Sequence, residues 1–259
     1  MSTLLNKNKR ALILVMIALS LIVLLFSYFY YHHVNSSKDP RIKYARELYE
    51  NYNDLTVQNN FVAIFSLLDS VEYNYRKIDH YQKSFEVGVL YNNRAAAYLT
   101  MALYDNRPEK YMLLSKDSLL YLAQQNVYKS ISIYKSWLSQ FDQLTTSAQI
   151  EKFISGNFFI GLEKYSKKEK SNFLKSRIKE IETAQYETKR RLSVAYTNLG
   201  IIHRHFEDYE NAINSYQKAI ELWDQNLNAE NNLNILLGKP LKKRNLIQKL
   251  FPPKRKEEK

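Results

Sequence analysis

The chain has 259 residues, with 38 Lys and Arg against 26 Asp and Glu, no Cys, and only five Gly and five Pro. The lack of thiols excludes disulfides, thiolate metal sites and a Cys nucleophile. So few Gly and Pro argue against an all-β fold, which needs a turn about every 8–12 residues. The net charge of +12 lies mainly at the two ends, so the central part lacks the basic excess typical of a nucleic-acid-binding domain.

The first predicted element is a membrane-spanning helix over residues 11–31. The stretch ALILVMIALSLIVLLFSYFYY has 21 residues and no charge, Gly or Pro. As a helix it would be about 31 Å long, close to the thickness of the hydrocarbon core, and its aromatic end suits the membrane interface. A cleaved signal peptide has a shorter apolar core and a small-x-small cleavage site, so we interpret the stretch as a signal anchor.

The charges on either side of this stretch bear on its orientation. Three basic residues in the 1–10 tail lie directly before it, and four in 38–46 follow at a greater distance. The flanks nearly balance under the positive-inside rule, but a short basic N-tail usually stays in the cytoplasm. We therefore expect a single-pass protein of the inner (cytoplasmic) membrane, with residues 1–10 inside and the C-terminal domain periplasmic or extracytoplasmic.

After a polar linker at 32–40, the body 41–238 has helical periodicity and no sustained alternation typical of a strand. Breaks fall at polar or Pro-containing segments such as Asp105–Pro108. The predicted fold class of the body is therefore all-α. The predicted helices are 41–53, 57–77, 79–104, 109–139, 146–164, 168–206, 209–223 and 228–237.

Residues 193–226 form a pattern of two helices in 34 residues. Small residues, Gly200 and Ala212, stand where the helices would press together, and larger residues fill the space between turns. The pattern resembles a tetratricopeptide repeat (TPR), although His203 replaces an aromatic residue and Asp224 stands where the motif often has Pro. The residues at the motif's W, L, G, Y, A, F and A places are Tyr196, Leu199, Gly200, His203, Ala212, Tyr216 and Ala219.

A weaker copy of the pattern covers residues 88–135. Tyr91, Ala95 and Tyr98 align with the W, G and Y places of a first helix, and the second helix follows an insertion of roughly sixteen residues. The packing residues of that second helix would be Ala123, Val127 and Ser130.

One repeat cannot bury its apolar face alone, so a clean repeat implies packed neighbours. A further, fainter copy can be argued at 41–76, and 228–237 resembles the capping helix that closes such arrays. The resemblance thus implies a TPR-like α-solenoid of helix pairs. Together with the predicted span, the expected architecture is one N-terminal transmembrane helix followed by this solenoid.

The sequence shows no motif for catalysis, cofactor binding or metal binding. Gly156-x4-Gly161 has P-loop spacing, but Leu162 and Glu163 follow where Lys and Ser/Thr are required. No H-E-x-x-H or other metal-ligand spacing occurs. We therefore expect a non-catalytic protein without a cofactor or metal. An envelope hydrolase stays open as an alternative, because the members of a Ser/His/Asp site need not be near in sequence.

The resemblance to TPR proteins implies a groove lined by the first helices of successive repeats, which takes a peptide or a partner helix. The Lys and Asn pair with which some TPRs grip a C-terminal carboxylate is missing here, so an apolar or helical partner fits better. The same side chains could equally pack against neighbouring helices. The expected groove residues are Val194, Thr197 and Ile201 in the clean repeat and Val89, Asn92 and Ala96 in the weaker one.

The tail 239–259 carries nine basic and two acidic residues. An anionic lipid surface is the first functional interpretation, ahead of an acidic partner, whereas nucleic acid would require the reverse orientation; a solvated terminus is the structural alternative. The residues expected to make such contacts are Lys242, Lys243, Arg244, Lys249, Lys254, Arg255 and Lys256.

These observations predict a membrane-tethered TPR scaffold or adaptor that binds a protein partner. We expect it to be a component or assembly factor of a bacterial cell-envelope complex. The alternative has the reverse topology: a cytosol-facing membrane docking receptor that collects client proteins or peptides in a TPR groove.

Overall fold

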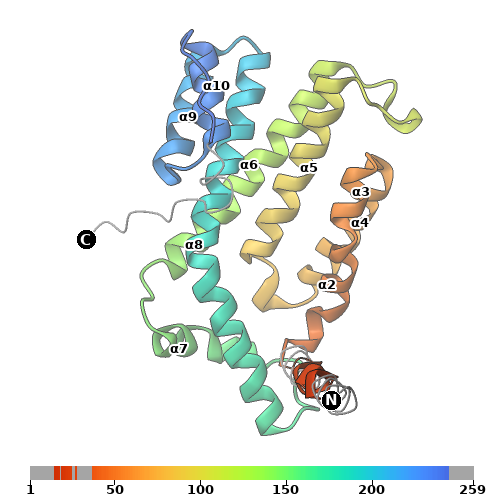
Figure 1. Cartoon of the computed structure of the whole chain (residues 1–259), viewed down its shortest axis with the longest axis vertical. Helices are drawn as coiled ribbons and strands as arrows, with labels where there is room; N and C mark the ends of the chain where they lie inside the picture. Colours follow the sequence, from red (N-terminus) through yellow and green to blue (C-terminus); the bar gives the residue numbers. More distant parts are fainter. Residues whose placement is uncertain (1–14, 18, 25–26, 28–36, 245–259) are drawn as a thin grey trace, which may run out of the picture.

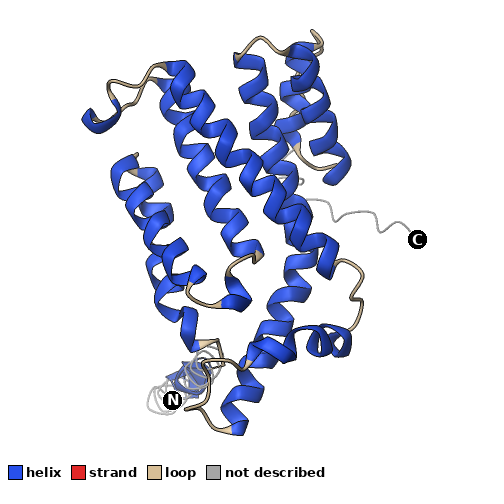
Figure 2. Cartoon of the chain, turned by 180° about the vertical axis from the view of Figure 1, so that it is seen from behind, coloured by secondary structure: helices blue, strands red, loops and turns tan. Residues whose placement is uncertain are grey.

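The computed structural model describes residues 15–17, 19–24, 27 and 37–244. Within these ranges every regular element is a helix and none is a strand (Figure 2), so the predicted all-α class is confirmed. In chain order, with η for a 3-10 helix, the elements are η1 (Pro40–Ile42), α2 (Lys43–Glu50), α3 (Tyr52–Val57), α4 (Phe61–Arg76), η2 (Asp79–Tyr81), α5 (Phe85–Tyr104), η3 (Glu109–Tyr111), α6 (Lys116–Phe141), α7 (Ser147–Phe158), α8 (Lys167–His205), α9 (Tyr209–Leu222) and α10 (Leu227–Leu236).

Successive helices pack as pairs that are stacked along the molecule. The closest pairs are α5 with α6 and α8 with α9; α8 also packs on α6, and α10 packs on α9. Figure 1 shows α2 to α4 at one edge, α5 and α6 in the middle, and the second half of α8 with α9 and α10 at the other edge. This is the stacked arrangement of an α-solenoid.

Several predicted helices begin or end elsewhere in the structure, each for a local reason. The predicted helix 146–164 is wrong beyond Phe158, since Gly161 takes a φ of +81°, a left-handed conformation that cannot continue an α-helix. The predicted helix 109–139 begins as η3 and restarts after Ser115, whose Oγ accepts a hydrogen bond from the Ser118 amide at 3.1 Å. The predicted helix 79–104 is also divided, into η2 and α5, which begins after Ser84; here the serine side chain makes no capping hydrogen bond.

The longest helix, α8, spans 39 residues and crosses two hydrophobic cores. Its start is fixed by a capping box, in which Ser166 Oγ accepts from the Glu169 amide and Glu169 accepts from the Ser166 amide. The larger core lies between α2, α4, α5, α6 and the second half of α8. A second core joins the end of α6, α7 and the first half of α8, around Trp137, Phe158 and Ile181. The α7 segment thus adds a separate core beside the stacked pairs.

The predicted membrane span 11–31 lies largely outside the described residues. In its described part, residues 15–17 and 19–24 are helical. Their large apolar side chains are exposed, from 48% at Ile22 to 64% at Leu24. No helix in the described ranges is both long enough and apolar enough to cross a bilayer.

Candidate protein-binding surface

The helix pair of the clean repeat is held by a close contact between α8 and α9. Gly200 faces the ring of Tyr216, and a Cβ at Gly200 would lie 2.5 Å from Tyr216 Cε1, closer than any side chain could pack. Ala212, Tyr216 and Ala219 are all fully buried. The glycine therefore sets the separation of the two helices.

The pair formed by α5 and α6 repeats this contact. Gly88 faces Tyr134, and a Cβ at Gly88 would also lie 2.5 Å from the ring. Ser130 Oγ donates a hydrogen bond to the Gly88 carbonyl at 2.8 Å. The spacing Ser130-x3-Tyr134 matches Ala212-x3-Tyr216 in the clean repeat.

The close contact in this weaker pair lies seven residues before Ala95, which the sequence pattern places at the glycine position. Seven residues are nearly two helical turns, so both alignments present the same face of α5. Ala95 is accordingly buried, as are Ala123, Val127 and Ser130 of the second helix. One sequence feature could have identified Gly88 as the counterpart of Gly200. The segment Val87-Gly88-x2-Tyr91 has the same spacing as Leu199-Gly200-x2-His203.

The first helices of the pairs, α2, α5 and α8, are linked to one another by polar side chains. Asn93 Nδ2 on α5 donates to Tyr49 OH on α2 at 2.7 Å. Asn198 Nδ2 on α8 donates to Asn92 Oδ1 on α5 at 3.2 Å. Burial raises the pKa of Tyr49, which keeps its hydroxyl protonated. These contacts bring the three helices together as one continuous surface, here called the first-helix surface.

The six predicted groove residues are not equally accessible on this surface. Val194 is 36% exposed, and Val89, Asn92, Ala96 and Ile201 are half-buried. Thr197, however, is only 5% exposed.

The side chain of Thr197 is used in packing. Its hydroxyl donates to the Ser193 carbonyl at 3.0 Å and accepts from Asn226 Nδ2 at 2.9 Å. Thr197 thus joins α8 to the start of α10 and offers no free polar group to a partner.

A hollow of about 360 Å³ adjoins the first-helix surface where the first half of α8 passes the start of α5. Phe85 and Ala184 give it an apolar part, and Lys179, Glu180 and Arg191 are among its charged residues. The Arg191 guanidinium lies 5.5 Å from the centroid of the Phe85 ring. The hollow has both the apolar and the charged components that a peptide side chain could contact.

Residues 193–226 match the protein family described as tetratricopeptide repeat. This segment resembles a TPR. No curated protein and no solved structure matches the chain significantly. The match spans the α8–α9 pair with its Gly200–Tyr216 contact, and α5–α6 shows the same contact without a match of its own.

TPRs are typically non-catalytic modules that bind other proteins. The described residues include no group of three or more His, Asp or Glu placed to hold a metal ion.

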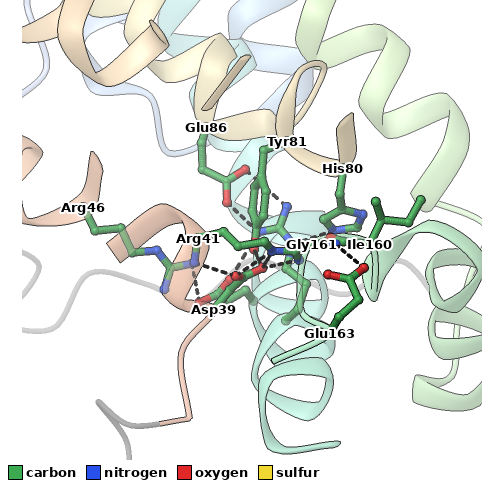
Figure 3. Close-up of polar contacts among 11 residues, drawn as sticks. Asp39, Arg41, Arg46, His80, Tyr81, Glu86, Ile160, Gly161 and Glu163 are labelled. Carbon is green, nitrogen blue, oxygen red and sulfur yellow. Dashed lines mark hydrogen bonds and ion pairs between the residues drawn. The ribbon is translucent and has the colours of Figure 1, made fainter. Parts of the chain in front are cut away.

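The stacked helix pairs are joined to the residues after the linker by a polar cluster (Figure 3), here called the junction cluster. Its centre is Arg177 on α8, which is 2% exposed. Arg177 donates to Glu86 Oε1 at 2.5 Å and to His80 Nε2 at 3.2 Å, and its guanidinium lies 4.4 Å from the centroid of the Tyr81 ring. The buried cation therefore has partners from both η2 and α5, as a buried charge requires.

The electrostatics of the junction cluster follow from burial and from Arg177. Burial by itself would raise the pKa of Glu86, but the Arg177 guanidinium lowers it below its usual value. Burial, and then the same guanidinium, lower the pKa of His80 to about 3. His80 is therefore neutral near pH 7 and accepts the Arg177 hydrogen bond.

A second part of the junction cluster holds the chain just after the linker. Asp39 accepts a hydrogen bond from Tyr81 OH at 3.0 Å and forms an ion pair with Arg41 at 2.6 Å. Arg41 Nη1 donates to the Ile160 carbonyl in the loop between α7 and α8. Arg46 forms an ion pair with Glu180 on α8 at 2.6 Å. Residues 39–46 are thus fixed to η2, to α8 and to the α7–α8 loop.

The described part of the basic tail folds back along α10. Lys242 forms an ion pair with Glu230, and its backbone N–H and C=O both bond the Asn231 side chain. Arg244 donates to the Gln225 carbonyl at 2.7 Å, whereas Lys243 is exposed. The remaining predicted contact residues, Lys249, Lys254, Arg255 and Lys256, lie outside the described residues.

Proposed function

We propose that this protein is a membrane-tethered TPR scaffold that binds a protein partner through the first-helix surface. The observation that carries the proposal is the TPR at 193–226, stacked on a second helix pair with the same Gly–Tyr contact. Stacked pairs present their first helices side by side, and this extended surface is what repeat proteins use for binding. The partly apolar character of Val89, Val194 and Ile201 favours an apolar or helical partner.

The tethering part of the proposal rests on the N-terminal sequence. The uncharged stretch 11–31 has the length of a membrane span. The apolar side chains of its described part are exposed and need another environment. We propose an inner-membrane location with the body outside the cytoplasm, as a component of a cell-envelope complex. The near balance of basic charge on the two flanks makes the cytosol-facing docking receptor the alternative.

Partner binding is tested by purifying the full chain from its native membrane in mild detergent. We expect one partner to co-purify in stoichiometric amount. The substitution Val194→Arg puts a charge on the first-helix surface and should reduce recovery about tenfold or more. Val62→Arg is the matched control, because Val62 is similarly exposed (40% against 36%) but lies on α4, a second helix. Equal recovery of the partner with both variants would contradict the proposed surface.

Topology is tested with two reporters fused after Lys259, one active only in the cytoplasm and one active only outside it. Activity outside the cytoplasm supports the envelope scaffold. Cytoplasmic activity would overturn that orientation and favour the docking receptor.

A further inference from the structure

The loop between α7 and α8, residues 159–166, exposes apolar side chains although its neighbouring residues are buried. Phe158 and Leu162 on either side of the exposed residues are fully buried, whereas Phe159 and Ile160 are 37% and 60% exposed. The Leu162 amide donates to the Phe159 carbonyl at 3.0 Å, and the Gly161 amide donates to Glu163 at 2.9 Å. The loop is therefore a turn fixed by hydrogen bonds and by buried neighbours, and its two large apolar residues face outward.

Exposed basic residues follow these apolar side chains in the chain. Lys164 is exposed in the loop, and Lys167 and Lys168 are exposed in the first turn of α8. Cations at the start of a helix oppose the helix dipole, which favours acidic residues there. Two exposed acidic residues lie in the same segment, but both accept backbone hydrogen bonds there: Glu163 from the Gly161 amide and Glu169 from the Ser166 amide. The three lysines outnumber them, and this basic excess suggests an external anionic partner.

The position of the loop relative to the proposed anchor identifies that partner. Arg41 binds the Ile160 carbonyl directly, and ten residue steps separate Arg41 from Tyr31, the end of the uncharged stretch. Ten steps can span at most about 35 Å. In both views the described residues 15–17 and 19–24 and the start of α8 lie at the same end of the molecule (Figures 1 and 2).

We infer that the α7–α8 loop, with the first turn of α8, is a membrane-docking surface that binds an anionic bilayer. Phe159 and Ile160 enter the interfacial region, and Lys164, Lys167 and Lys168 contact lipid headgroups, with their aliphatic stems along the apolar boundary. This inference rests on the proposed membrane tether. Through Arg41 and the junction cluster, such docking fixes how the TPR pairs stand relative to the bilayer.

The test uses the full chain in lipid nanodiscs, either of phosphatidylcholine alone or of phosphatidylcholine mixed with phosphatidylglycerol. Because the chain has no Cys, Ile160→Cys gives a single attachment point for an environment-sensitive fluorophore. Leu113→Cys is the control, since Leu113 is fully exposed. It belongs to the α5–α6 connection, and this connection lies at the end of the molecule opposite the start of α8 (Figure 1). We expect strong quenching by doxyl-labelled lipids at position 160 in the anionic discs, and none at position 113.

Charge dependence is tested by adding Lys164→Glu, Lys167→Glu and Lys168→Glu to Ile160→Cys. Quenching in anionic discs should fall several-fold, whereas the same reversal at exposed lysines elsewhere, Lys110, Lys116 and Lys129, should leave it unchanged. Equal quenching in both kinds of disc would overturn the assignment of anionic lipid.

The outcomes separate this inference from the tether on which it rests. A chain that is retained in discs but is not quenched at position 160 overturns the docking surface and leaves the anchor in place. A chain that is not retained in discs overturns both. If the loop becomes protected only when a co-purified protein is present, its partner is that protein and the lipid assignment is overturned.

Discussion

At the scale of single residues, the two interior glycines of the helix pairs have a measurable role. Gly200→Ala would place a methyl group 2.5 Å from Tyr216, so the helices must separate or the ring must move, at a cost of about 1–3 kcal/mol. Gly156→Ala is the control, since no atom lies within 4 Å of its added Cβ and Ala is favoured over Gly in a helix by about 1 kcal/mol. We expect Gly200→Ala to lower the free energy of unfolding in denaturant titrations and Gly156→Ala to raise it slightly. If both variants were stabilised, Gly200 would not set the helix separation.

His80 gives the junction cluster a defined pH dependence. Its pKa falls from 6.5 to about 3 on folding, through burial and then through Arg177, with Arg41 acting in the same direction and Glu86 and Asp39 opposing it. Below pH 6.5 the unfolded chain therefore binds a proton that the folded chain does not, and stability falls by up to about 1.4 kcal/mol per pH unit.

His80→Gln keeps a hydrogen-bond acceptor for Arg177 but does not titrate. Between pH 6.5 and pH 5 we expect the wild type to lose about 2 kcal/mol more unfolding free energy than this variant. Urea titrations of both proteins at the two pH values measure the difference. The same loss in both proteins would show that His80 is protonated without cost in the folded state.

At the scale of elements, α10 is held by one side chain with three hydrogen bonds. Asn226 Oδ1 accepts from the Ala229 amide at 3.0 Å, and Nδ2 donates to Ser193 Oγ and Thr197 Oγ1 at 2.8 and 2.9 Å. Removing the cap costs about 1 kcal/mol, and each lost buried hydrogen bond costs about as much again. Asn226→Ala should therefore destabilise by about 2–3 kcal/mol.

Asn60→Ala is the comparison for this prediction, because Asn60 caps α4 through the Ala63 amide at 3.2 Å but is exposed. It should cost only about 1 kcal/mol. Hydrogen exchange should show early loss of protection in α10 for Asn226→Ala. Equal destabilisation by the two variants would mean that the bonds to α8 contribute nothing.

The sequence pattern predicts the helices well where apolar periodicity and caps agree. The predicted 168–206, 209–223 and 228–237 lie within one residue of α8, α9 and α10. It fails where one residue's backbone overrides an otherwise helical pattern. The positive φ of Gly161 ends α7 within a stretch whose side chains still look helical, and propensity alone cannot reveal which glycine adopts such a conformation.

The candidate surface could be predicted only in part. The clean repeat identifies Val194 and Ile201 at accessible places, because the motif fixes which face of the helix packs. In the weaker repeat a shift of seven residues keeps the same face, so periodicity cannot choose between Gly88 and Ala95. The junction cluster could not be predicted, because Arg177 contacts His80 and Glu86 from more than ninety positions away. In the sequence, nothing distinguishes Arg177 from the other charged residues of its helix.

At the scale of the whole molecule, stacked pairs should unfold from the end that is weakened. Each pair contacts mainly its neighbours, so stability is close to a sum of local contributions. Tyr216→Ala removes a fully buried ring from the α8–α9 contact and should cost about 3–5 kcal/mol. We expect hydrogen exchange to lose protection in α9, α10 and the end of α8, while α4 keeps its protection.

A variant at the opposite end of the stack tests whether unfolding stays local there as well. Phe65 on α4 is 7% exposed and packs against Tyr98, with ring centroids 4.5 Å apart and the rings tilted by 36°. Phe65→Ala should therefore loosen α2 to α4 and spare α9. The long helix α8 opposes such independent unfolding, because it passes through both hydrophobic cores and couples them. Uniform loss of protection in every helix for both variants would show that this coupling makes the whole body one cooperative unit. Protection lost separately at each end would show that α9 and α10 can unfold while the α2–α4 end, near the proposed anchor, stays folded.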